Sequence, residues 1–199
     1  MKIYGLTGGI ACGKSTVSEI LTELGAAVVD ADEASRLVMK PGQNAYKEIC
    51  KHFGHEVLSE DGQINRQVLG KIVFENAQQR TILESITHPA IRHEVTQQLL
   101  MASQIGKPIG VVEAALLVEN GSYSNYNGLI VVSCRPELQL QRLMKRNGFS
   151  EEEAIARIDS QWPLSKKESV ADWLIMNNFD RKHLKQETEI VWRALIDGV

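Results

Sequence analysis

The chain has 199 residues, and its 22 basic and 25 acidic side chains give a net charge of −3. This length suits one domain with an inserted subdomain, and 43% hydrophobic with 24% charged residues is ordinary for a globular protein. The weakly acidic balance argues against bulk binding to nucleic acid, and the longest apolar run, residues 109–118, is too short to span a membrane. Three widely spaced cysteines without a Cys-x-x-Cys pair, and no visible targeting segment, predict a cytoplasmic protein with reduced thiols.

The first predicted strand, residues 3–6, leads into a glycine-rich loop and then a helix over residues 16–24. Residues 8–15 match the pattern G-x-x-x-x-G-K-[ST] at every required position. In such a loop the backbone N–H groups surround phosphate oxygens, Lys14 adds charge toward the β- and γ-phosphates, and the Ser15 hydroxyl is placed to coordinate Mg²⁺. We therefore predict that a nucleotide binds through Gly8, Gly9, Ile10, Ala11, Cys12, Gly13, Lys14, Ser15 and Thr16.

The second predicted strand, residues 26–30, ends in Asp30-Ala31-Asp32. Ligands of open α/β sheets bind beyond the carboxyl ends of the strands, so both carboxylates are expected at the edge that carries the phosphate loop. One could accept a proton from an attacking hydroxyl, and the other could help to hold Mg²⁺ through water. The alternative interpretation is that Asp32 only caps the following helix.

A long segment, residues 41–102, separates the second strand from the third and is predicted to be helical. One helix begins at Asn44, another includes residues 68–74, and Pro89 is expected at the first position of a helix that runs to Met101. An all-helical insert at this place in a nucleotide-binding fold often holds the acceptor substrate. Four basic residues lie in or near the insert: Arg36, Arg66, His88 and Arg92. Taken one by one, they are more typical of surface or packing positions, and His88 could serve as a helix cap.

The third and fourth predicted strands are residues 109–113 and 129–133. Glu113 ends the third strand, where a carboxylate that organises magnesium usually lies; the alternative is a pairing with a nearby lysine. Pro136 then opens a helix that carries Arg142 and Arg146 on one face, and such a pair either closes over the transferring phosphoryl group or forms a solvated basic surface.

A helical hairpin is predicted after the fourth strand, because Asn147-Gly148 ends its first helix and Ser150 with Glu153 forms a capping box. After the fifth strand, residues 173–176, Asn177 either bonds an adenine edge or lies in a turn with Asn178, and Asp180 caps the last helix. The alternation of strands and helices predicts an α/β fold: a five-stranded parallel sheet with helices on both faces.

In sequence order, the matching blocks resemble the dephospho-CoA kinase family over nearly the whole chain. They comprise residues 5–15, 29–32 with Arg36, Arg66 with Leu69 and Phe74, 87–89, 116–119, 142–148, 157–158 with Gln161, and 171–172 with Asn177. The resemblance implies a P-loop kinase that uses ATP and Mg²⁺ to phosphorylate the ribose 3′-hydroxyl of dephospho-coenzyme A, the final step of coenzyme A biosynthesis. It implies no nucleic acid, membrane or obligatory protein partner.

The resemblance also implies roles for residues and segments. Asp32 is the expected catalytic base, Lys14 and Arg142 bind the phosphoryl group, Ser15 holds Mg²⁺, and Glu113 does so through water. Around the acceptor it places Asp32, Arg36, Arg66, His88 and Leu116. The nucleotide core is predicted at 1–40, 103–136 and 165–199, the acceptor insert at 41–102 and a lid at 137–164.

The chain departs from the family pattern in its phosphate loop, where Ala11-Cys12 replaces a common Gly-Ser. The helix N-terminus favours a Cys12 thiolate, but we interpret Cys12 as a small residue in a small space. Glu113 and Ala115 stand where Asp and Pro are frequent. Two other functions remain open at this point: a nucleoside or nucleoside-monophosphate kinase, and a nucleotide-sensing switch without an acceptor.

Overall fold

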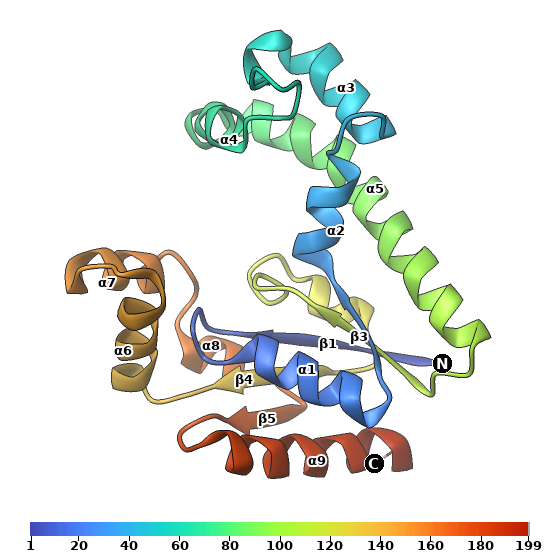
Figure 1. The fold of residues 1–199 in the computed structure, drawn as a ribbon, viewed down its shortest axis with the longest axis vertical. Coiled ribbons are helices and arrows are strands. Elements are labelled where there is room, and N and C mark those ends of the chain that lie inside the picture. The colour runs from blue at the N-terminus through green and yellow to red at the C-terminus, as the bar shows by residue number, and fades with distance from the viewer. Residues whose placement is uncertain (199) are drawn as a thin grey trace. The chain divides into compact units, whose positions relative to one another are not determined.

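The computed structural model describes residues 1–198, and its elements are labelled in Figure 1. The chain divides into two compact units: Met1–Val29 with Met101–Val199, and Asp30–Leu100. We call them the sheet unit and the helical unit, and each is described by itself.

The sheet unit is built on a five-stranded sheet with the strand order β2-β3-β1-β4-β5. Its strands are β1 (Lys2–Gly8), β2 (Ala27–Asp30), β3 (Ile109–Glu113), β4 (Leu129–Ser133) and β5 (Trp173–Met176). Strand β1 pairs in parallel with β3 and β4, and β4 pairs in parallel with β5. The five predicted strands and the parallel α/β fold are therefore confirmed, with β1 longer than predicted at both ends.

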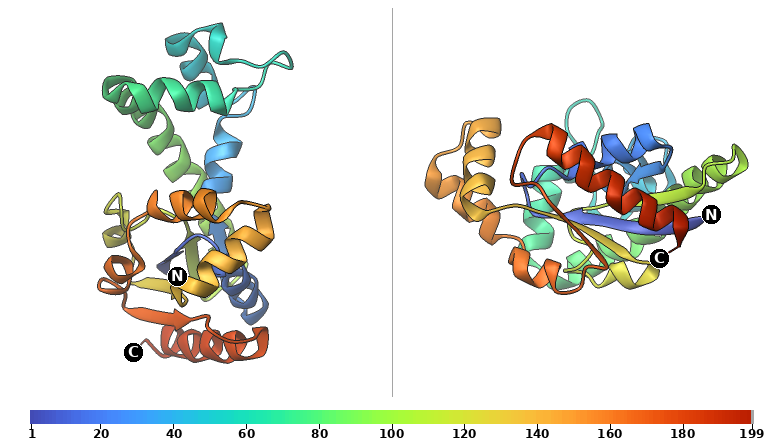
Figure 2. Two further views of the ribbon diagram at one scale, coloured as in Figure 1. Left: turned by 90° about the vertical axis from the view of Figure 1, so that its left-hand side faces the viewer. Right: turned by 90° about the horizontal axis from the view of Figure 1, so that it is seen from below.

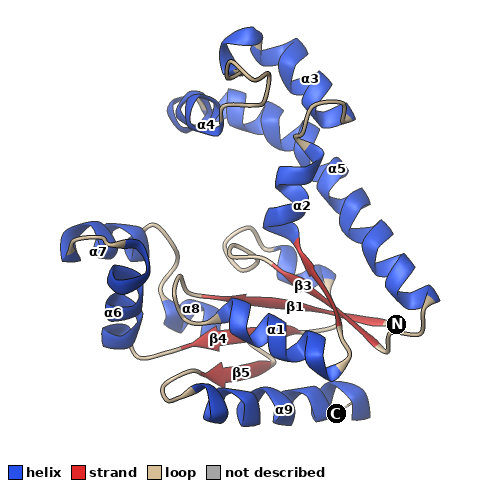
Figure 3. Cartoon of the chain, viewed as in Figure 1, coloured by secondary structure: helices blue, strands red, loops and turns tan. Residues whose placement is uncertain are grey.

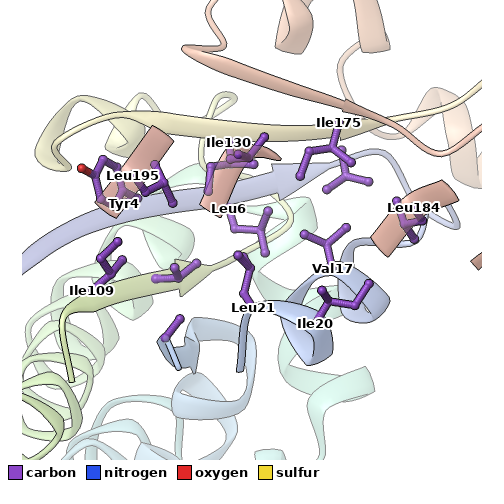
Figure 4. Close-up of a cluster of buried hydrophobic side chains, with 14 of the residues drawn as sticks. Tyr4, Leu6, Val17, Ile20, Leu21, Ile109, Ile130, Ile175, Leu184 and Leu195 are labelled. Carbon is purple, nitrogen blue, oxygen red and sulfur yellow. The ribbon is translucent and has the colours of Figure 1, made fainter. Parts of the chain in front are cut away.

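Both faces of the sheet are buried, which explains why its strands are continuous apolar runs. Along β4, Ile130 and Val132 belong to one apolar cluster and Leu129 and Val131 to another, because successive side chains point to opposite faces. In the first cluster the strands pack against α1 (Lys14–Leu24) and α9 (Arg181–Asp197). Figure 4 shows the side chains of both helices directed toward those of the strands.

The other helices of the sheet unit are α6 (Pro136–Asn147), α7 (Glu151–Asp159) and α8 (Leu164–Glu168), with a short 3-10 helix at Ser122–Asn125. Helices α6 and α7 form the predicted hairpin, visible from two further sides in Figure 2. Gly148 ends α6 in the left-handed conformation, and Ser150 and Glu153 make both bonds of the capping box. The Asp180 carboxylate accepts from the His183 N–H and caps α9, as predicted.

The helical unit contains α2 (Ala31–Val38), α3 (Asn44–Phe53), a 3-10 helix (His55–Val57), α4 (Arg66–Glu75) and the part of α5 (Ala77–Gln104) up to Leu100. Figure 3 shows these helices joined by loops. Ile49, Phe53, Val57 and Leu69 form its core.

The prediction that Pro89 begins a helix is wrong, because Pro89 lies inside α5. A proline in a helix interior removes one hydrogen bond and costs about 3 kcal/mol. The helix nevertheless continues, since Leu83 and Ile86 pack on the core before the proline and Val95 and Leu99 are buried after it. His88 is therefore an exposed residue within α5, and its predicted alternative role as a cap is also wrong.

Within residues 1–198, no helix is both long enough and apolar enough to cross a membrane.

Candidate active site

The phosphate loop connects β1 to α1, and its backbone conformation depends on two residues with positive φ. Gly13 has φ 97°, and a Cβ atom there would lie 2.2 Å from the Asn177 amide nitrogen, so only glycine fits. Ala11 has φ 59° and is the one non-glycine residue with positive φ in the described chain. A left-handed alanine costs roughly 1 kcal/mol, so the surrounding structure holds the loop in place against this strain.

Three amide side chains hold the loop through its backbone. The Ile10 N–H donates to Gln161 Oε1 at 2.8 Å, and Gln139 Nε2 donates to the Ile10 carbonyl at 3.0 Å. Asn177 Nδ2 donates to the Cys12 carbonyl at 2.9 Å. Because Gln139 is on α6 and Gln161 follows α7, the hairpin is bonded directly to the phosphate loop.

Lys14 begins α1, and its Nζ lies 2.5 Å from Glu113 Oε1 at the end of β3. The Ser18 hydroxyl, one turn further along α1, donates to the other Glu113 oxygen. The lysine pairing that was the alternative role for Glu113 is thus present, with Lys14 as the partner. The Glu113 carboxylate thus holds the Lys14 ammonium beside the phosphate loop, where Lys14 is expected to bind phosphate.

Arg142 and Arg146 on α6 lie in different environments. Arg142 is half-buried and Nη1 donates to the Asn177 carbonyl at 2.9 Å, so its guanidinium lies next to the residue that holds Cys12. Arg146 is exposed and bonds only to its neighbour Asn147 among the described residues. The basic face therefore divides into one anchored arginine and one solvated arginine.

Asn177 is buried, and both its side-chain amide and its carbonyl bind protein groups at the loop. Asn178 Oδ1 accepts from the Arg135 N–H, which fixes the turn after β5. Asn177 thus links the phosphate loop to Arg142. Its expected contact with adenine stays a prediction.

Cys12 fills a small, fully buried space, as its interpretation as a small residue requires. Its hydrogen bond with Cys134 and its burial raise the pKa of the Cys12 thiol. The expectation that the helix N-terminus favours a Cys12 thiolate is therefore wrong, because these two effects outweigh the helix end.

In the helical unit, Asp32, Ser35, Arg36 and Arg66 line a cavity of about 310 Å³. Burial and the neighbouring Arg36 charge lower the pKa of Arg66, and the Asp32 carboxylate opposes this shift. Two guanidinium groups in one cavity favour a ligand with several negative charges, such as a diphosphate. The carboxylate beside them is placed to accept a hydrogen bond from a hydroxyl of the same ligand.

The cap of α2 is Asp30, whose Oδ1 accepts from the Asp32 and Glu33 N–H groups at 2.7 and 3.1 Å. The alternative in which Asp32 only caps this helix is therefore wrong, since Asp32 lies in the first turn and lines the cavity. His88 is not one of the residues that line it, and Leu116 is an exposed residue of the sheet unit.

Three residues of the sheet unit were missed by the sequence analysis. Ser18 follows Lys14 by four positions, and this helical spacing was a usable signal. Gln139 lies on the predicted helix without any motif. Lys167 is fully buried, and its Nζ bonds Glu119 Oε1 at 2.7 Å and the Ala115 carbonyl at 2.8 Å; no local pattern indicates this.

Comparison with known proteins identifies the family. The family model described as dephospho-CoA kinase matches residues 2–183. The chain belongs to the dephospho-CoA kinase family. A dephospho-CoA kinase of Geobacillus kaustophilus (strain HTA426) is 45% identical over 194 residues, which cover 96% of each chain.

Solved structures agree with this family assignment. A dephospho-CoA kinase from Campylobacter jejuni is 34% identical, covers 98% of each chain and has a TM-score of 0.70. A crystal structure from Thermus thermophilus is 30% identical with a TM-score of 0.84, over 98% of this chain and 97% of that one. The resemblance to dephospho-CoA kinases is confirmed, and the chain is a kinase of that family rather than a nucleoside kinase or a switch.

Proposed function

We propose that this protein transfers the γ-phosphoryl group of ATP to the ribose 3′-hydroxyl of dephospho-coenzyme A, giving coenzyme A and ADP, with Asp32 as the base. The observation that carries the assignment of Asp32 is the cavity that it shares with Arg36 and Arg66. Membership of the dephospho-CoA kinase family supports the reaction itself.

The donor site in this proposal is the phosphate loop, from Gly8 to Thr16. Backbone N–H groups bind the phosphates, and Lys14 moves from its carboxylate partner toward the β- and γ-phosphates when ATP binds. Arg142 neutralises the charge that develops on the transferring group, and its anchor on Asn177 holds it near the loop beforehand. Asn177 is proposed to contribute to the adenine end of the site.

Magnesium fits the same end of the sheet. The Ser15 hydroxyl is exposed at the second position of α1, and Glu113 places a carboxylate beside Lys14. In the described residues no group of three or more His, Cys, Asp or Glu side chains could hold a metal ion by itself. Mg²⁺ commonly takes one or two protein ligands together with substrate phosphates and water, so Ser15 with Glu113 through water is a sufficient set. Bound Mg²⁺ supplies charge neutralisation at the phosphates.

The acceptor is proposed to bind to the helical segment 41–102 together with α2. Arg36 and Arg66 bind its diphosphate, and Asp32 accepts the proton of the attacking hydroxyl. His88 and Leu116 stay predictions as residues that contact the acceptor. Residues 137–164 act as a lid that excludes water, which limits transfer of the phosphoryl group to water.

The test is the Asp32→Asn variant, with Glu33→Gln as the matched control on the same turn of α2. Loss of a general base lowers turnover by about 10²- to 10⁴-fold, whereas the KM for ATP is expected to stay within about twofold. Glu33→Gln is expected to keep wild-type turnover. Near-normal turnover of Asp32→Asn would remove Asp32 from the role of base.

A substrate panel tests the reaction independently of this residue. ADP release is followed with dephospho-coenzyme A, adenosine and AMP as acceptors, and only the first is expected to support turnover. A preference for adenosine or AMP would contradict the proposed acceptor.

We also place the reaction in the cytoplasm, because the three cysteines are free thiols.

A further inference from the structure

Two of the three cysteines, one in the phosphate loop and one after β4, lie in contact. Cys12 belongs to the loop, Cys134 follows β4 directly, and their Sγ atoms are 3.3 Å apart although 122 positions separate them in sequence. Cys12 is 0% and Cys134 3% exposed. A sulfur–sulfur bond is about 2.05 Å long, so a shift of little more than 1 Å would bring the two atoms to bonding distance.

The surroundings give the two sulfur atoms unequal acidity. The hydrogen bond with Cys12 and the nearby Arg142 guanidinium lower the pKa of the Cys134 thiol, although its burial opposes this. The same hydrogen bond, together with burial, raises the pKa of Cys12. Because the nearby Arg142 guanidinium stabilises a thiolate on Cys134, we assign Cys134 as the attacking thiol and Cys12 as the thiol that completes the disulfide.

We propose that Cys12 and Cys134 form a redox modification site that a peroxide converts to a disulfide. The Cys134 thiolate attacks one peroxide oxygen, the O–O bond breaks, and the departing hydroxide takes a proton to become water. The sulfenic acid on Cys134 is then attacked by Cys12; the S–S bond forms, the S–O bond breaks, and the leaving hydroxide takes the Cys12 proton. Two thiols lose two electrons in all, and one hydrogen peroxide is reduced to two waters.

The burial of both thiols selects the class of oxidant. Hydrogen peroxide is about the size of a water molecule, whereas a disulfide such as oxidised glutathione must bring a whole peptide to the sulfur atom. We therefore assign the site to small peroxides rather than to thiol–disulfide exchange.

The disulfide would distort the phosphate loop, because Cys12 is held from two sides. Asn177 binds its carbonyl and the Cys12 N–H donates to Gly9 at 3.1 Å, while Ala11 and Gly13 already have positive φ. Pulling Cys12 toward Cys134 therefore moves backbone N–H groups away from the positions that phosphate requires. This step rests on the proposed function, because it assumes that ATP binds at this loop; the formation of the disulfide does not.

The first measurement follows the bond itself and needs no ATP. The full-length protein is treated with hydrogen peroxide, the excess is removed with catalase, and intact mass and a non-reducing peptide digest are recorded. We expect the loss of two hydrogens and one peptide pair joined through Cys12 and Cys134. No such pair after oxidation of the folded protein would overturn the proposal.

The second measurement is the affinity for ATP by titration calorimetry before oxidation, after it, and after dithiothreitol. We expect affinity to fall at least about tenfold, which corresponds to 1.4 kcal/mol, and to return on reduction. Cys134→Ser and Cys134→Ala should bind ATP and be insensitive to peroxide, whereas Cys50→Ser, which removes the third thiol, should stay sensitive. Equal sensitivity of the Cys134 variants, or a cross-linked protein with unchanged affinity, would overturn the effect on the loop. Failure of the reduced protein to bind ATP would count against the proposed function instead.

Discussion

Replacing Lys167 by methionine is expected to lower the free energy of unfolding by several kcal/mol. The Lys167 side chain is 0% exposed, and its ammonium binds Glu119 and the Ala115 carbonyl. The Thr7 hydroxyl donates to the same carbonyl at 3.1 Å, so the segment after β3 is fixed to β1 and α8 together. Methionine keeps the length of the apolar stem up to Cε and removes the ammonium group.

The magnitude follows from what the substitution leaves behind. Glu119 Oε2 is already buried without a hydrogen-bond partner in the described chain, and Oε1 would keep only the Trp162 N–H at 3.2 Å. A buried carboxylate that loses its cation costs about 3–5 kcal/mol. In a chain of this size each kcal/mol lowers Tm by about 2–4 °C, so the expected decrease is about 6–20 °C.

Urea denaturation followed by circular dichroism measures this loss of unfolding free energy. Lys166→Met is the matched control, because Lys166 is exposed on the same helix and its ammonium contacts only the Trp162 ring among the described residues, so the change should cost less than about 1 kcal/mol. Adding Glu119→Gln to Lys167→Met removes the stranded charge and should restore about 1–2 kcal/mol. A Lys167→Met protein as stable as the control would refute the reasoning from burial.

Three further predictions concern the phosphate loop. Ala11→Gly should raise the unfolding free energy by about 0.5–1 kcal/mol, because glycine adopts the left-handed conformation without strain. The control Ala156→Gly, on the exposed face of α7, should lower the unfolding free energy by about 1 kcal/mol. Changes of the same sign for both variants in urea denaturation would contradict this. Gln139→Ala should raise the KM for ATP by about five- to thirtyfold, the equivalent of about 1–2 kcal/mol, because it removes the amide that binds the Ile10 carbonyl. Gln141→Ala, an exposed position on the same helix, should leave the KM unchanged. The same KM for both variants would show that the Gln139 amide does not support ATP binding. Chelation of Mg²⁺ should abolish turnover, and Ser15→Ala should shift the Mg²⁺ titration upward by about tenfold; an unchanged titration would remove Ser15 from the metal site.

The strands and most helix ends could be predicted because their signals are local. A strand buried on both faces is a continuous apolar run, and a cap such as Asp180 or Ser150 lies within three residues of the N–H group that it binds. The phosphate loop is local in the same sense, since one short pattern contains all its glycines and Lys14.

The partners in contacts across the sheet could not be predicted, because they depend on the strand order. Lys14 with Glu113 and Cys12 with Cys134 are neighbours since β1 lies between β3 and β4. Alternating strands and helices indicate a parallel sheet without fixing which strands are adjacent. Lys167 shows the same limit, because a charged residue beside another lysine has the sequence signature of a surface position.

The wrong prediction for Pro89 and the excluded alternative for Asp32 have a common physical reason. Proline at Pro89 gives the same signal at a helix start and inside a helix long enough to tolerate it, and only the packing of α5 on both sides decides between them. Asp30 and Asp32 are both good cap residues, and the residue at which β2 ends decides which of them caps α2.

The two glutamine bonds to Ile10 make the hairpin and the nucleotide site thermodynamically linked. Any rotation of α6 and α7 relative to β1 either breaks a bond to Ile10 or carries the loop with it. A ligand that favours one hairpin position must then change the affinity for ATP, and ATP must change the affinity for that ligand by the same factor. The two hydrogen bonds of Ile10 therefore couple the position of the hairpin to the affinity of the loop for ATP.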